Sequence, residues 1–153
     1  MIVTTQNKMN YTSIELIRLL LIMLWVYAAF VKLGNMEANF DAMQKQIFSK
    51  PVANILAYTV PISELLAVVF LLIRIRTGFL LSITLLSAFS LYIGLILLHV
   101  FGDIPCSCGG IFQGMGHKTH LFFNISMLLI AILGLIIYDR IKGKAENLEK
   151  SRH

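Results

Sequence analysis

Charged side chains are scarce in this chain. Only 14% of its 153 residues are Asp, Glu, Lys or Arg, whereas a soluble domain carries about 25%. Hydrophobic residues make up 58% and gather in long runs, so too little polar surface remains to cover a water-soluble fold. The composition therefore predicts one small helical membrane domain in a lipid bilayer. The formal charge of +5 does not indicate nucleic-acid binding, because the basic residues stand mostly at the ends of apolar runs.

A cleavage site of small residues is also missing after the first apolar run. Since that run continues for a full span, we expect a retained anchor and not a removable signal peptide. Four runs are long enough to cross about 30 Å of hydrocarbon, and they cover residues 14–33, 51–73, 77–101 and 119–138. The last two contain no Asp, Glu, Lys or Arg. The sequence predicts an all-α fold, a bundle of four transmembrane helices.

The distribution of lysine and arginine predicts the orientation of these spans. Basic residues collect in the tail, residues 139–153, and at Arg74 and Arg76 between the second and third spans. Such residues favour the cytoplasm, and with four spans both termini then lie there. The loops 34–50 and 102–118 are placed outside. We therefore expect a multi-pass protein of a bacterial inner membrane, whose outer loops face the periplasm, where disulfides persist.

Only two cysteines occur, and both lie in the 102–118 loop, as Cys106 and Cys108. A disulfide that closes so small a ring would contribute only about 1.6 kcal/mol as a structural staple, before strain is subtracted. A strained, exposed disulfide is instead typical of exchange reactions. We interpret Cys106 and Cys108 as a catalytic pair, which makes the chain a candidate thiol-disulfide oxidoreductase. The sequence does not distinguish which cysteine attacks.

Histidines flank the cysteine pair. His99, His117 and His120, together with the positive N-terminus of the fourth helix, could stabilise a thiolate. An ordinary position at the membrane–water interface, without a role in catalysis, explains these histidines equally well. Two cysteines with histidines also offer ligands for copper(I) or zinc. We predict no metal site, because the set of four ligands spaced as in structural zinc sites is missing, and metal handling stays an alternative.

Glu64 and Lys32 are charged residues within the predicted spans, away from the cytoplasmic edge where Glu15 and Arg18 lie. Burying the Glu64 carboxylate in a membrane costs on the order of 2.5 to 3.5 kcal/mol, so it needs a partner. Lys32 could pair with it if Pro61 opens the second helix; alternatively, Glu64 is protonated and relays protons. A polar contact that fixes the helix arrangement explains both residues as well as direct chemistry does. Asn124, a polar residue in the fourth span, fits helix packing better than substrate binding.

A redox pair needs an electron donor or acceptor. The candidate cofactor is a quinone held among aromatic side chains such as Phe89, Tyr92 and Phe101, although no quinone-binding motif can be identified.

The order of these features resembles the MauE family of methylamine utilisation proteins, within the wider DoxX-like group of four-helix membrane proteins. The resemblance extends over most of the chain. It rests on Arg18, Phe30-Val31-Lys32-Leu33-Gly34, Pro61-Ile62-Ser63-Glu64-Leu65, and Cys106-Ser107-Cys108-Gly109-Gly110 ahead of a span with His120 and Asn124. The cysteine loop departs from the Cys-Gly-Cys-Phe-Gly form of the family.

The resemblance implies disulfide chemistry in the periplasm with a thioredoxin-like partner, since MauE is associated with maturing a disulfide-rich dehydrogenase subunit. It does not imply methylamine metabolism for this chain. Vitamin K epoxide reductase and quinone-linked disulfide oxidases offer a mechanistic analogy. We expect a membrane thiol-disulfide redox protein that supports disulfide formation or electron transfer to such a partner. A non-enzymatic membrane assembly or chaperone subunit and a copper- or zinc-handling protein stay open as alternatives.

Overall fold

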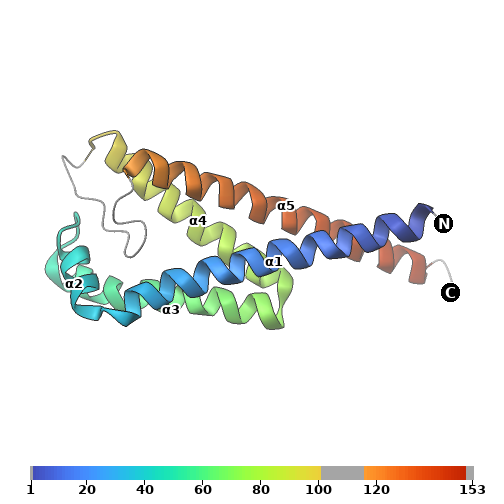
Figure 1. Ribbon diagram of the computed structural model, residues 1–153, viewed down its shortest axis with the longest axis horizontal. Coiled ribbons are helices and arrows are strands. Elements are labelled where there is room, and N and C mark those ends of the chain that lie inside the picture. The colour runs from blue at the N-terminus through green and yellow to red at the C-terminus, as the bar shows by residue number, and fades with distance from the viewer. Residues whose placement is uncertain (1, 101–115, 151–153) are drawn as a thin grey trace.

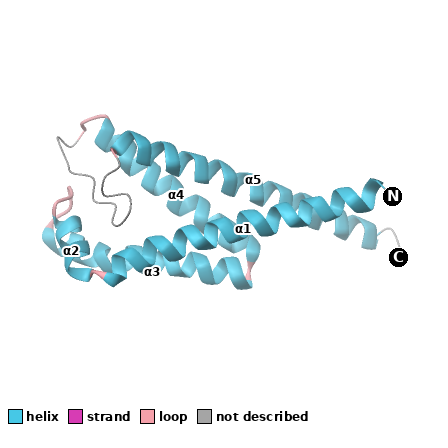
Figure 2. Ribbon diagram, viewed as in Figure 1, coloured by secondary structure: helices cyan, strands magenta, loops and turns pink. Residues whose placement is uncertain are grey.

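The computed structural model describes residues 2–100 and 116–150, and side chains within 11–100 and 116–144. Its helices are α1 (Ile2–Gly34), α2 (Met36–Gln44), α3 (Lys50–Ile73), α4 (Ile75–Leu97) and α5 (His117–Lys150). Short turns join α1 through α4, and the described part of the chain contains no strand (Figure 2). The predicted all-α fold class is confirmed.

The four long helices form one bundle (Figure 1). Within it, α1 packs beside α3 and α4 beside α5, while contacts of α3 with α4 and of α1 with α5 close the ring. Both chain ends lie at one end of the bundle, and α2 lies at the other, which we call the α2 end. All four long helices are long and apolar enough to cross a membrane. The chain is a multi-pass membrane protein.

The helices differ in extent from the predicted spans. α1 and α5 continue beyond residues 14–33 and 119–138, because hydropathy marks the part of a helix in lipid and not its continuation into water. α4 ends at Leu97, before the predicted end of the third span at residue 101, which lies outside the described residues. α2 occupies part of the 34–50 loop, where no helix was predicted.

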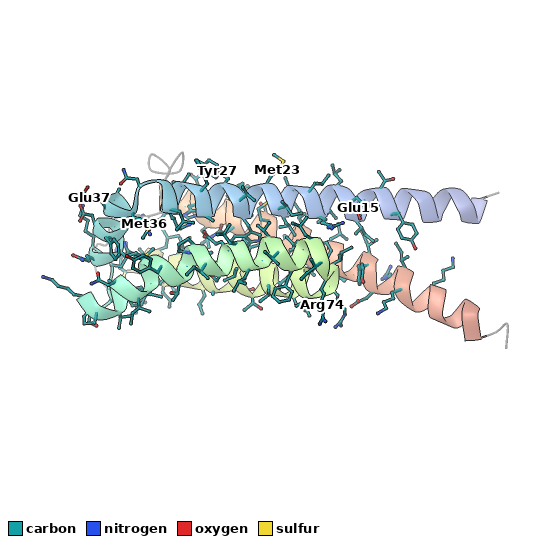
Figure 3. All side chains as sticks on the ribbon, turned by 90° about the horizontal axis from the view of Figure 1, so that it is seen from below. Glu15, Met23, Tyr27, Met36, Glu37 and Arg74 are labelled. Carbon is teal, nitrogen blue, oxygen red and sulfur yellow. The ribbon has the colours of Figure 1, made fainter. Side chains whose placement is uncertain are left out.

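Apolar side chains cover both the inside and the outside of the bundle. Trp25 and Leu71 are buried, whereas Met23 on α1 is 69% exposed and points away from the other helices (Figure 3). Leu91 and Leu129 are similarly exposed on α4 and α5. So much exposed apolar surface would promote aggregation in water, but it matches lipid chains. The outer surface therefore agrees with a membrane environment.

Pro61 lies inside α3 without ending the helix. Proline has no backbone N–H, so the carbonyl of Ala57, four residues earlier, loses its helical donor. The side chain of Asn39 on α2 replaces that donor: its Nδ2 donates to the Ala57 carbonyl at 2.8 Å, and Asn39 is buried. Asn35 caps the start of α2 by accepting from the N–H of Ala38 at 3.1 Å. The hydrogen bond from Asn39 to the Ala57 carbonyl explains why the short α2 packs against α3.

Arg18 holds the opposite end of α3. Its Nε donates to the carbonyl of Leu71 at 2.7 Å and its NH2 group to that of Leu72 at 3.1 Å, while Glu15 pairs with it at 3.0 Å. The last carbonyls of a helix have no intrahelical donor, and a cation near them is also favourable to the helix dipole. Arg18 therefore caps the end of α3 in addition to forming an ion pair with Glu15.

Replacing Arg18 with methionine is expected to lower the free energy of unfolding by about 1.5–3 kcal/mol, because hydrogen bonds from a charged donor to two carbonyls are lost. Arg76 provides the matched control, since its pair with Asp139 at 3.0 Å is exposed and such pairs contribute at most about 1 kcal/mol. Thermal unfolding in detergent micelles compares the two variants. Equal losses would contradict the capping role of Arg18.

Candidate functional site

A cavity of about 300 Å³ lies among the helices towards the α2 end. Its walls come from all four long helices, from α2 and from the segment that joins α2 to α3. Lys32, in the last turn of α1, Ile96 near the end of α4, and His117, the first residue of α5, all line it. Trp25 and Leu86 line its deeper part. The cavity therefore reaches from the α2 end into the membrane-spanning part of the bundle.

A buried ion pair forms part of the cavity wall. Lys32 Nζ lies 2.7 Å from Glu64 Oε1 and also donates to the carbonyl of Ala28 at 3.2 Å. The side chain of Glu64 is 1% exposed and that of Lys32 is 15% exposed. The predicted pairing is therefore present, although α3 continues as a helix through Pro61 and is not opened by it. The pair lowers the cost of placing a carboxylate in the bundle.

One face of α5 supplies three more polar side chains. His117, His120 and Asn124 are spaced three and four residues apart, so they lie on the same side of the helix, and all three line the cavity. His120 and Asn124 are buried. His117 and His120, which were grouped around the cysteines from the sequence, and Asn124 therefore line the same cavity as Lys32 and Glu64.

Four buried polar side-chain atoms of the described residues have no hydrogen-bond partner. Among the described side chains, these atoms are Oε2 of Glu64, Nε2 of His117, Nδ2 of Asn124 and Oγ of Ser90. The first three belong to cavity residues, whereas Ser90 does not line the cavity. Each unsatisfied buried group costs about 1–3 kcal/mol, so such groups are uncommon in folded proteins. Their concentration around one cavity indicates a place where a polar ligand atom or a water molecule binds.

Aromatic rings make up much of the remaining wall. Trp25 and Phe89 pack with their ring centroids 6.3 Å apart, and the indole N–H of Trp25 donates to Ser82 Oγ at 2.9 Å. Near the α2 end, Tyr92 stacks on Phe48 with centroids 5.8 Å apart. The Tyr92 hydroxyl is 2.6 Å from Oε1 of Gln46. The site is thus apolar and aromatic, with a few polar groups, as is typical of small-molecule sites.

Cys106 and Cys108 lie outside the described residues, as does Phe101. The chain that contains the cysteines nevertheless joins α4 to α5, and Ile96 and His117, close to the two ends of this connection, both line the cavity.

The metal alternative depends on the same two cysteines. In the part of the chain that the structure describes, no three His, Cys, Asp or Glu side chains come together as metal ligands. His99, the third histidine of the sequence interpretation, has a positive φ of 53° and is not a cavity residue.

Other residues of the site were not found by sequence reasoning. Trp25 is the chain's single tryptophan and stands within an apolar span, which was a signal for a special environment. Gln46 and Phe48 gave no signal, because they lie in a loop and reach the cavity only through the packing of α2 on α3.

Comparison with known proteins identifies the family. No curated protein and no solved structure matches the chain. The family model described as methylamine utilisation protein MauE matches residues 10–137. This range contains the first three long apolar segments, most of the fourth, and every cavity residue named above. The match covers most of the chain, and the chain belongs to the MauE family.

Proposed function

We propose that this MauE-family protein is a membrane thiol-disulfide redox protein in which Cys106 and Cys108 exchange a disulfide with a thioredoxin-like or disulfide-containing partner. The observation that carries the proposal is the placement of the chain's only two cysteines, two residues apart, in the connection between α4 and α5. A ring this small is a poor staple but a suitable exchangeable disulfide.

The charge distribution supports a periplasmic location for that connection. Arg74, at the turn between α3 and α4, lies in the half of the bundle that faces the chain ends (Figure 3). Arg76 is joined to Asp139 on α5, next to the basic residues of the tail. Basic residues next to spans favour the cytoplasmic side, so the proposal places both chain ends in the cytoplasm and the α4–α5 connection across an inner membrane, in a compartment that permits disulfides.

The proposed exchange passes through a mixed disulfide. A thiolate of the partner attacks one sulfur of the Cys106–Cys108 disulfide, which forms a bond between the proteins and releases the other cysteine as a thiolate. A second partner thiolate then attacks the mixed disulfide. This step leaves a disulfide in the partner and two reduced cysteines here, and the reverse sequence of steps transfers electrons the other way. No atoms or electrons are left over in either direction.

Trapping in intact cells tests this proposal. Cells are quenched with acid, free thiols are labelled with a mass tag, and wild type is compared with the Cys106→Ser, Cys108→Ser and doubly substituted variants. We expect both oxidised and reduced forms in wild type, and a larger, reductant-sensitive adduct in at least one single variant. The absence of a resolving cysteine prevents release of the partner, which is why the adduct accumulates.

The double variant serves as the control, since it can form no adduct. A wild-type pair that stays fully reduced, with no adduct in either single variant, would overturn the proposed exchange. A double variant that retains the cellular function of the wild type would point instead to an assembly subunit.

A further inference from the structure

The polar and apolar parts of the cavity call for different ligand chemistry. Oε2 of Glu64 accepts a hydrogen bond, Nδ2 of Asn124 donates one, and Nε2 of His117 does either, depending on its tautomer. A lipid acyl chain would leave all three atoms unsatisfied. A small sugar or amino acid would leave the rings of Trp25 and Phe89 against polar groups. A ligand that satisfies the whole cavity therefore has a flat apolar body and polar atoms at its edge.

The size and place of the cavity narrow this class further. A volume of about 300 Å³ exceeds the roughly 150 Å³ that holds a benzene ring in an apolar cavity, so a substituted six-membered ring fits. The cavity lies within a helix bundle that crosses the membrane. Compounds dissolved in the lipid are therefore the ligands that can reach it. Quinones combine these properties: a flat ring, two ring oxygens that accept hydrogen bonds when oxidised and donate them when reduced, and solubility in the bilayer.

We propose that the cavity lined by Glu64, His117 and Asn124 binds the headgroup of a membrane quinone. The amide of Asn124 donates to one ring oxygen, and the free Oε2 of Glu64 accepts from the hydroxyl that forms on reduction. Trp25 and Phe89 pack against the ring. Negative charge develops on the quinone oxygens as they gain electrons, and the amide donor of Asn124 and the cation of Lys32 in the same cavity stabilise such charge, so they favour the quinone as the oxidant.

The redox step rests on the proposed function and balances with it. Two cysteine thiols give up two electrons and two protons as the S–S bond forms, and the quinone takes up both to become a hydroquinone. The regenerated disulfide is then available for exchange with the partner protein. Both ends of the connection that carries the cysteines are close to cavity residues, namely Ile96 and His117.

Tryptophan fluorescence offers a direct test of binding, because Trp25 is the only tryptophan and lines the cavity. The full chain with Cys106→Ser and Cys108→Ser is purified in detergent micelles and titrated with decylubiquinone and with menadione. We expect saturable quenching by at least one of them. Decanol, which has a chain but no ring, is expected neither to quench nor to displace the quinone.

Two variants in the same cysteine-free background locate the site. Asn124→Leu is expected to raise the apparent Kd about tenfold, since loss of one hydrogen bond to a buried group has an effect of that order. His117→Phe provides a second cavity variant if the first does not fold, as judged by gel filtration. Ser90→Ala is the matched control: its Oγ is also buried without a partner, but it lies outside the cavity.

These outcomes test the quinone site independently of the disulfide exchange. Saturable quenching that weakens in the cavity variants and not in Ser90→Ala supports the quinone site, even if no mixed disulfide is ever trapped. Quenching that rises linearly with quinone, or that is identical in all variants, shows partition into the micelle only and overturns the site. Displacement of the quinone by decanol also overturns it, because the occupant is then an acyl chain.

Discussion

Lys32→Met is expected to destabilise the bundle by about 3–5 kcal/mol, the cost of leaving one partner of a buried ion pair alone. Lys32 Nζ lies 2.7 Å from Glu64 Oε1, and the Glu64 side chain is almost completely buried. The second oxygen of Glu64 has no hydrogen-bond partner, so after the substitution the described side chains would offer no compensating cation to this carboxylate. Thermal unfolding in detergent, followed by the fluorescence of Trp25, measures the loss.

The double substitution Lys32→Met with Glu64→Leu separates a lost charge pair from lost packing. Two apolar residues of similar volume remove both charges, and replacing a whole buried pair in this way is often neutral or stabilising. We therefore expect the double variant to unfold near the wild-type temperature. A double variant as unstable as Lys32→Met would show that the shape of the side chains, and not the unpaired charge, accounts for the loss.

Gly78→Ala is expected to destabilise the protein by about 1–3 kcal/mol, the range for overpacking a well-packed interior. A Cβ atom at this position would overlap the backbone nitrogen of Leu71 and lie 2.5 Å from its Cα. Backbone atoms cannot rotate away, so α3 and α4 would have to move apart at the turn that joins them. Small residues permit such close approach of helices in membranes.

Gly94→Ala is the matched control on the same helix, since nothing lies within 4 Å of a Cβ atom built at Gly94. Alanine is a better helix former than glycine by about 1 kcal/mol, so this variant is expected to be neutral or slightly stabilised. The comparison uses the midpoint temperature of unfolding in the same detergent. A loss in both variants would contradict the packing argument.

Hydropathy was sufficient to predict the four long helices, because a helix in lipid must be apolar over its whole membrane length. The short α2 could not be predicted in this way. Its sequence mixes charged and apolar residues over Met36–Gln44, and its position depends on the bond from Asn39 to the Ala57 carbonyl, which is free only because of Pro61. The hydrogen bond that holds α2 in place could therefore be recognised only in the structure.

The candidate site could likewise be predicted from the sequence only in part. A charge inside a span demands a partner, so Lys32 and Glu64 could be paired from the sequence. His120 and Asn124 were part of the family resemblance, and the structure adds that they line the same cavity as this pair. The cavity itself could not be predicted, because its walls come from residues far apart in the sequence, including Gln46 in the loop between α2 and α3.

The polar groups of α3 bind to residues that are synthesised before α3 itself. A membrane protein is synthesised from its N-terminus, and its early segments fold first. Asn39 precedes the Ala57 carbonyl by 18 residues, and Lys32 precedes Glu64 by 32. When the Ala57 carbonyl and Glu64 enter the bilayer, the side chains that bind them have therefore already been made. The first three helices can complete their internal bonding without waiting for α4 and α5, so the N-terminal half can serve as the template on which the rest of the bundle assembles.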